Sequence, residues 1–225
     1  FFYEYYYIQH SKMLPYVDAK LAVSKNFFSI NKKNRWITNK KSRILANFLR
    51  SKYDCLLTTS KTINDDNPLL NCRVEGLEQK SPNIIILDRL FRVKKNSIIF
   101  KKNKMKIYIL TNVDSPSKEQ FFKKKGVKVI KLKKMENHTK NLKNIFYIIK
   151  KLGFNRIIVE SGVTFLEQLI KYNLIKNFYL FRSFRNLGTE GSNNTNPLYL
   201  KKINFSKKNQ IKVNLEEDKL YKVKI

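Results

Sequence analysis

The fold is decided by one stretch of sequence, Arg156-Ile157-Ile158-Val159-Glu160-Ser161-Gly162-Val163-Thr164. Its continuous apolar run predicts a strand that is buried on both faces of a sheet. The small residues Ser161 and Gly162 predict a tight turn, and the residues that follow, as far as Tyr172, have the apolar spacing of a helix. A strand that leads through a short turn into a helix is the repeating unit of α/β proteins. We therefore expect an α/β fold with a largely parallel central sheet flanked by helices.

The same alternation extends from this stretch in both directions. We expect further strands over residues 14–24, 54–59, 83–87, 106–111, 127–132 and 177–182. We expect helices over residues 117–125 and 139–152. Gly126 and Gly153 follow these two helices directly, as glycine often does at a helix end. At the C-terminal end, residues 210–215 and 220–225 predict an antiparallel hairpin at the sheet edge.

One more helix is expected after Thr38 and Asn39, which are both suited to cap a helix start. Apolar residues recur there at helical spacing, namely Ile44, Leu45, Phe48 and Leu49. We expect this stripe to face the sheet.

The chain is strongly basic, with 47 Lys and Arg against 17 Asp and Glu, a formal net charge of +30. Such a charge is typical of proteins that bind nucleic acid or anionic membranes. The excess is mostly Lys and is scattered along the chain, so we interpret it as a bias in residue usage and expect neither partner. The aromatic start, residues 1–8, carries Glu4 and resembles neither a signal peptide nor a membrane span, so we expect a cytoplasmic protein.

The two cysteines, Cys55 and Cys72, have neither C-x-x-C spacing nor a nearby His. This argues against a structural zinc site and against a disulfide framework. We expect buried thiols and no metal. The length of 225 residues is compatible with one large domain or two small ones, and we favour one.

Chemistry is most plausible at the turn after residues 156–160. The free amide groups of a helix start, with the positive end of the helix dipole, favour a phosphate group, and glycine permits its close approach. The G-x-G-x-x-G fingerprint is absent, so the signal is weak on its own. Glu160 ends a central strand, where α/β proteins usually bind ligands.

A second cluster is the polar stretch from Thr62 to Arg73, which we expect to form a loop after the strand at residues 54–59. Arg50 and Arg73 stand out in a chain that overwhelmingly uses Lys, because the planar guanidinium group suits a phosphate. The lone Trp36 is either a core residue or a residue that stacks on an aromatic ligand.

Short motifs spread over residues 14–191 give the remaining evidence. They are Pro15-Tyr16-Val17, Lys20-Leu21-Ala22-Val23-Ser24, Trp36-Ile37-Thr38, Leu49-Arg50-Ser51 with Asp54, Thr62-Ile63, Asp66-Asn67-Pro68-Leu69-Leu70 with Arg73, Leu87-Asp88, Val159-Glu160-Ser161-Gly162 and Leu187-Gly188. In their order and spacing, these motifs resemble the C-terminal reductase domain of the bifunctional riboflavin biosynthesis deaminase-reductases, the RibD family.

The resemblance implies a dihydrofolate-reductase-like fold, a homodimer, and reduction of 5-amino-6-(5-phosphoribosylamino)uracil by NADPH at C1′ of the ribosyl group. It also implies site residues. NADPH would contact Val23, Trp36, Thr62, Asp66, Arg89, Gly162, Val163, Thr164, Phe165 and Leu166. The substrate would contact Asn34, Arg50, Leu70, Arg73 and Glu160, with the two arginines at its 5′-phosphate. Glu160 and Asp66 are candidate proton donors on chemical grounds.

The chain departs from the family pattern at several positions. The family usually has Ser-Leu-Asp-Gly after its first strand, whereas this chain has Ser24-Lys25-Asn26-Phe27. Ser161 replaces the first glycine of the usual Glu-Gly-Gly turn, and Asn34 replaces a common Ser. These changes put the nicotinamide end of the site, and therefore the exact substrate, in question.

The family also carries an N-terminal zinc deaminase domain, whose H-x-E and P-C-x-x-C motifs are absent from this sequence. We interpret residues 1–13 as the junction that follows such a domain and residues 14–225 as the reductase domain. A longer parent chain fused to a deaminase is thus compatible with the sequence.

Two alternatives stay open from the sequence. The first is a reductase of the same fold that acts on a different pterin or pyrimidine, because a fold does not fix a substrate. The second is a basic nucleic-acid-binding module without enzymatic activity.

Overall fold

The computed structural model describes residues 14–225, except 102–104, 134–136, 194–195 and 197. The chain divides into two compact units. Of the described residues, unit 1 comprises those at 14–16 together with Arg50–Ile158, and unit 2 comprises Val17–Leu49 and Val159–Ile225. The expected boundary between residues 13 and 14 lies at the edge of the described residues and stays a prediction.

Unit 1 is built on parallel strands. Its order is β7-β3-β4-β5-β6, with the bounds β3 Cys55–Thr59, β4 Asn83–Leu87, β5 Ile107–Thr111, β6 Val127–Lys131 and β7 Arg156–Glu160, the last of which ends in unit 2. The pairs β3–β4, β4–β5 and β5–β6 are all parallel. Its helices are α3 Ser60–Asp66, α4 Pro116–Lys124 and α5 His138–Lys151, with short 3₁₀ turns at Glu78–Lys80 and Ile98–Phe100. Residues 84–86 of β4 are fully buried, as the apolar run predicted.

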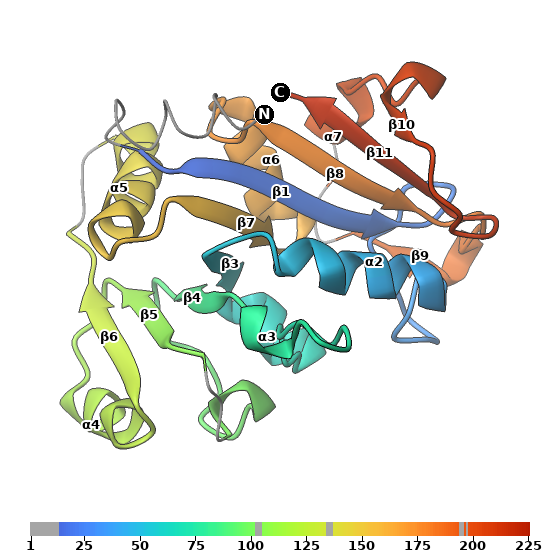
Figure 1. Ribbon diagram of the computed structural model, residues 1–225. Coiled ribbons are helices and arrows are strands. Elements are labelled where there is room, and N and C mark those ends of the chain that lie inside the picture. Colours follow the sequence, from blue (N-terminus) through green and yellow to red (C-terminus); the bar gives the residue numbers. More distant parts are fainter. Residues whose placement is uncertain (1–13, 102–104, 134–136, 194–195, 197) are drawn as a thin grey trace. The chain divides into compact units, whose positions relative to one another are not determined.

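Unit 2 contains the strands β1 Tyr16–Val23, β8 Asn177–Arg182, β10 Gln210–Ile211 and β11 Lys219–Lys224 in the order β10-β11-β8-β1. β1 and β8 are parallel, whereas β11 pairs antiparallel with β8 and with β10. Figure 1 shows β11, β8 and β1 side by side. A small second sheet pairs β2 Ile30–Asn31 with β9 Gly191–Ser192. Gly191 is required there, because an added Cβ would lie 2.2 Å from the Phe28 ring.

Helices and 3₁₀ turns complete the described part of unit 2. The helices are α2 Lys40–Arg50, whose last residue belongs to unit 1, α6 Val163–Lys171 and α7 Leu198–Lys202, and the turns are at Gly188–Glu190 and Lys207–Asn209. α2 packs through Ala46 on a core formed with Phe181, Leu215 and Leu220. Glu167 of α6 is buried and accepts the backbone N–H groups of Tyr199 and Leu200, both at 2.8 Å, which fixes α7.

The α/β fold, the mostly parallel strands and the C-terminal antiparallel hairpin are confirmed. Asn39 does cap α2, because its Oδ1 accepts the N–H of Ser42 at 2.9 Å. β10 is shorter than predicted, since only Gln210 and Ile211 pair with β11.

Two expectations about local structure were wrong. The start of the predicted polar loop is the helix α3, because the Thr59 side chain accepts the N–H of Thr62 and Asn67 ends the helix in a left-handed conformation, with φ of 42°. The apolar stripe of α2 does not face the sheet as a whole. Leu45 and Leu49 pack on the core, whereas Ile44 and Phe48 are 50% and 37% exposed.

Candidate active site

The end of β7 places Glu160 beside a lysine of β1. Glu160 is 8% exposed, and its Oε2 lies 3.5 Å from the Nζ of Lys20. The Lys20 ammonium group also lies 5.7 Å from the centre of the Phe181 ring. The opposite charges of the carboxylate and the ammonium group attract each other where water has limited access. This ion pair therefore keeps an acid and a base together at the carboxyl end of a strand.

The motif Lys20-Leu21-Ala22-Val23-Ser24 did not by itself indicate a role for Lys20. The signal that singles it out is its place in β1, where residues 16–19 are all buried and Lys20 is half-buried. A lysine in such a strand needs a partner, and the sequence alone did not indicate that the partner is Glu160.

The helix start after β7 has the form that the sequence predicted. Gly162 is the N-cap residue of α6, and among the described residues no side chain caps it. Its φ of −65° is one that any residue adopts, so the backbone conformation does not require glycine. Thr164 is exposed, whereas Val163, Phe165 and Leu166 are buried and can offer a ligand only their backbone groups.

The turn after β1 is well formed although it departs from the family pattern. Val23 is buried, and its carbonyl oxygen accepts the N–H of Ser183. Asn26 Oδ1 accepts the Ser24 hydroxyl at 2.6 Å and the Leu187 N–H at 3.2 Å, so an amide oxygen serves where a carboxylate was expected. Phe27, at the expected glycine, has a φ of 64°, in the left-handed region that glycine favours.

Asn34 and Trp36 lie together in an exposed segment of unit 2. Asn34 Oδ1 accepts the Trp36 N–H at 3.0 Å. Trp36 is 43% exposed, which resolves the open alternative: it is not a core residue. The guanidinium carbons of Arg35 and Arg43 lie 5.0 and 4.7 Å from its ring centre.

The predicted phosphate-binding arginines both belong to unit 1. Arg50 is 9% exposed and donates through Nη1 to the carbonyl oxygen of Asn71 at 3.0 Å. Arg73 lies two residues after Asn71 and is exposed. Leu70, directly before Asn71, is buried and has a φ of 57°. The structure thus links Arg50 to the loop that carries Leu70 and Arg73. Asn71 Oδ1 is buried and has no hydrogen-bond partner among the described residues.

The other predicted residues of unit 1 follow β3 and β4. Thr62 is half-buried in α3 with its Oγ1 3.1 Å from that of Thr59, and Asp66 is exposed at the helix end. Arg89 is half-buried directly after Asp88. Asp88 is 1% exposed, and its two oxygens accept the N–H groups of residues 92 and 93, both at 2.8 Å.

Both cysteines are buried and unpaired, as expected. Burial raises the pKa of the Cys55 thiol well above its ordinary value, with a smaller contribution from the charge of Asp54. Cys55 is therefore an inert core residue. Within the described ranges, no cluster of three or more metal-ligating His, Cys, Asp or Glu residues occurs. No helix in the same part of the chain has the length and apolarity needed to cross a membrane.

Comparison with known proteins gives a consistent result. The sequence model of the family described as the RibD C-terminal domain matches residues 17–216. The riboflavin biosynthesis protein RibD of Aquifex aeolicus is 29% identical over 169 residues, which are 74% of this chain and 46% of that protein. The 5-amino-6-(5-phosphoribosylamino)uracil reductase of Buchnera aphidicola from Acyrthosiphon pisum is 30% identical over 174 residues, 71% of this chain and 80% of that protein. The chain thus spans about half of the former relative and most of the latter.

Solved structures share the fold. RibD of Acinetobacter baumannii superposes with a TM-score of 0.78 at 18% identity, over 99% of this chain and 61% of that one. The riboflavin biosynthesis reductase Rib7 of Saccharomyces cerevisiae superposes with a TM-score of 0.70 at 20% identity, over 96% and 91% of the two chains.

Proposed function

Because the chain belongs to the RibD C-terminal domain family, we propose that it reduces 5-amino-6-(5-phosphoribosylamino)uracil with NADPH, opening the ribosyl ring to a ribityl chain. The observation that carries the proposal is the Buchnera relative of that name, because the match covers 80% of its length. When bound, NADPH supplies the hydride that adds to C1′ of the sugar. The chain's own residues then have to bind both molecules, orient them, and provide a proton for the ring oxygen.

We assign the proton to the pair Glu160 and Lys20. Their charged groups are 3.5 Å apart and mostly shielded from water, so the Lys20 ammonium group can give a proton to the ring oxygen while the Glu160 carboxylate holds that ammonium group in place. Asp66, the second candidate, is exposed at the end of α3. Asp66 is thus open to water, whereas the ion pair is shielded from it, so the Glu160–Lys20 pair is the better candidate.

The residues that follow β4 favour NADPH over NADH. In sites that select NADH, an acidic side chain commonly accepts the ribose hydroxyl group. Asp88 is unsuited to this role, because it is buried and each of its oxygens already accepts a backbone N–H. Arg89 is the next residue and is partly accessible, and a guanidinium group suits the additional phosphate of NADPH. We therefore assign Arg89 to that phosphate.

The remaining assignments follow the resemblance. The uncapped start of α6, from Gly162 to Leu166, offers backbone N–H groups and a positive dipole end to the pyrophosphate. Val23, Trp36, Thr62 and Asp66 complete the NADPH contacts. Asn34, Leu70 and Glu160 bind the substrate, and Arg50 and Arg73 its 5′-phosphate. We also propose that the enzyme is cytoplasmic and forms a homodimer. Light scattering of the purified chain measures the oligomeric state.

Oxidation of NADPH in the presence of the proposed substrate tests the function, with dihydrofolate as the competing substrate of a same-fold reductase. We expect turnover with the ribosylamino-pyrimidine phosphate and none with dihydrofolate. Turnover of dihydrofolate alone would contradict the proposal.

A further inference from the structure

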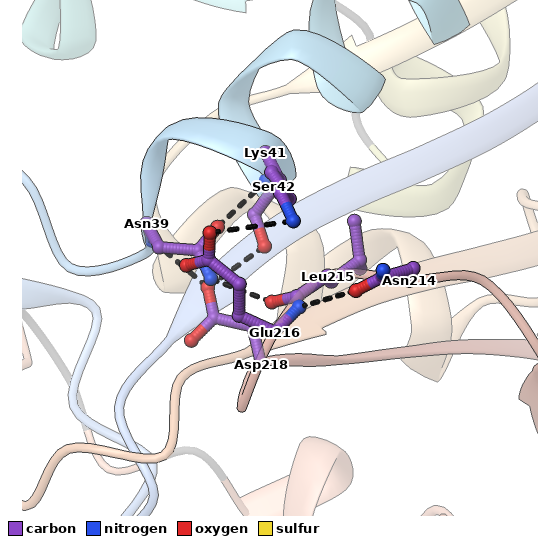
Figure 2. A network of polar contacts seen from close by, with 7 residues as sticks. All are labelled: Asn39, Lys41, Ser42, Asn214, Leu215, Glu216 and Asp218. Atoms are coloured by element: carbon purple, nitrogen blue, oxygen red, sulfur yellow. Dashed lines mark hydrogen bonds and ion pairs between the residues drawn. The ribbon is translucent and has the colours of Figure 1, made fainter.

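A buried carboxylate in the turn before β11 holds the start of α2 (Figure 2). Asp218 is 5% exposed, and its Oδ2 accepts hydrogen bonds from the backbone N–H of Asn39 at 2.8 Å and from the Ser42 hydroxyl at 2.7 Å. Its Oδ1 has no hydrogen-bond partner in the described part of the chain. Because a buried carboxylate is costly without such bonds, Asp218 is committed to the first turn of α2.

Asn39 links the same two segments a second time. Its side-chain Nδ2 donates to the carbonyl oxygen of Leu215 at 2.6 Å, while its Oδ1 caps the helix at Ser42. In Figure 2 the side chains of Asn39 and Ser42 converge with Asp218. By contrast, the side chain of Glu216 in the same turn forms an ion pair of 3.5 Å with Lys41, and both of these side chains are about half exposed. We call the hydrogen bonds among Asn39, Ser42, Leu215 and Asp218 the α2 clamp.

The α2 clamp is not needed to dock the helix on the sheet. Ala46 packs with Phe181, Leu215 and Leu220, and Leu45 and Leu49 add to the same core. Apolar burial of this kind is non-directional and tolerates small displacements along the helix axis. Hydrogen bonds are directional, so the clamp adds a fixed position for the first turn.

Trp36 depends on that position. Arg43, in the first turns of α2, donates through Nη1 to the carbonyl oxygen of Thr38 at 2.7 Å, and its guanidinium carbon lies 4.7 Å from the centre of the Trp36 ring. Trp36 is 43% exposed, so burial alone does not hold it. A shift of the first turn therefore moves both Arg43 and the segment that carries Trp36.

We propose that Asp218 is a positioning residue for Trp36, acting through Asn39, Ser42 and Arg43. The inference rests on the proposed function, which assigns Trp36 to NADPH. It adds that the C-terminal hairpin, which makes no assigned contact with either ligand, sets the affinity for the cofactor. Loss of the clamp raises KM for NADPH and changes kcat less, because Glu160 and Lys20 are untouched.

The experiment compares Asp218→Ala, Asp218→Asn and Ser42→Ala with the parent protein, and uses Glu216→Ala as the matched control from the same turn. Trp36 is the only tryptophan of the chain, so acrylamide quenching of tryptophan fluorescence reports its surroundings without any ligand. We expect faster quenching and a rise of about tenfold in the Kd for NADPH in Asp218→Ala, which loses both of the hydrogen bonds that Asp218 Oδ2 accepts. Asp218→Asn, which keeps one acceptor oxygen, restores most of both properties, and Glu216→Ala changes neither.

The outcomes separate this inference from the function on which it rests. A parent protein that binds no NADPH would remove the proposed function and, with it, the role of Asp218. A parent that binds NADPH, with a folded Asp218→Ala variant whose quenching and affinity equal those of the parent, would overturn the inference alone. If Asp218→Ala does not fold, Ser42→Ala decides, since it removes a single bond of the clamp and is expected to shift both readouts in the same direction by a smaller factor.

Discussion

The left-handed backbone at Phe27 predicts that Phe27→Gly is more stable than Phe27→Ala, which reverses the order found at ordinary positions. Phe27 has a φ of 64°. The centre of its ring lies 6.0 Å from that of the Phe205 ring and 4.8 Å from the guanidinium carbon of Arg182. Phe27→Ala and Phe27→Gly both remove these contacts, at a cost of about 1–2 kcal/mol. The difference between the two variants therefore isolates the backbone.

At an ordinary position, glycine is less stable than alanine by roughly 0.5–1 kcal/mol, because the unfolded chain gains freedom. In the left-handed region a residue with a Cβ is penalised by roughly 1–2 kcal/mol, and glycine is not. Subtracting the first effect from the second makes Phe27→Gly more stable than Phe27→Ala by about 0.5–1 kcal/mol.

Urea unfolding, followed by Trp36 fluorescence and by circular dichroism, measures this difference. Phe184 provides the matched control, because it is 43% exposed and is not among the described residues with positive φ. There, the alanine variant should be the more stable one. If Phe27→Gly is less stable than Phe27→Ala by the margin found at Phe184, the turn after β1 does not have the described conformation.

The remaining predictions concern the site and the core. Arg50→Ala should raise KM for the substrate by about 10–100-fold, whereas Arg185→Ala, at an exposed arginine, should leave it unchanged; equal values for the two variants would contradict the phosphate assignment. Glu160→Gln should lower kcat by about 100-fold and leave the Kd for NADPH within a factor of about two, and an unaltered kcat would exclude the Glu160–Lys20 pair from the protonation step. Because the pKa of Cys55 is raised in the folded state, the unfolded chain loses its proton first, near the ordinary value of 9.0, and folding stability falls as the pH rises further. Above that pH, the free energy of unfolding of the parent protein should therefore fall by about 1.4 kcal/mol per pH unit relative to that of Cys55→Ala. If the two proteins show the same dependence of this free energy on pH, the effect of burial on Cys55 is refuted.

Strands were predictable from the sequence because each is a short apolar run between polar or glycine-containing segments. β4 has the predicted bounds, and β7 does as well. Gly126 and Gly153 marked the ends of α4 and α5 because both have positive φ. These signals are local, so no tertiary information was needed.

The features that were missed depend on tertiary contacts or on residues outside the element concerned. The cap of α3 is Thr59, the last residue of a strand, and the helix contains several turn-forming residues. Helical spacing alone does not indicate which side of a wide apolar stripe is buried, which is why Ile44 and Phe48 were misplaced. The partner of Lys20 lies about 140 residues away in the chain.

The candidate site was identified mainly by resemblance rather than by physical reasoning. The strand-turn-helix at Glu160 and the contrast between Arg and Lys were visible locally, but neither specifies a substrate. The structure adds the ion pair with Lys20, the saturated Asp88 and the exposure of Trp36. The roles of the individual residues stay predictions until they are tested by substitution.

Transfer of deuterium from the nicotinamide C4 position of labelled NADPH to the substrate tests the central claim most directly. We predict that 5-amino-6-(5-phosphoribosylamino)uracil becomes a ribityl product that carries the label at C1′, as detected by mass spectrometry and NMR spectroscopy. A product without the label at C1′, or no product under conditions in which the protein is folded and binds NADPH, would contradict the proposed reaction.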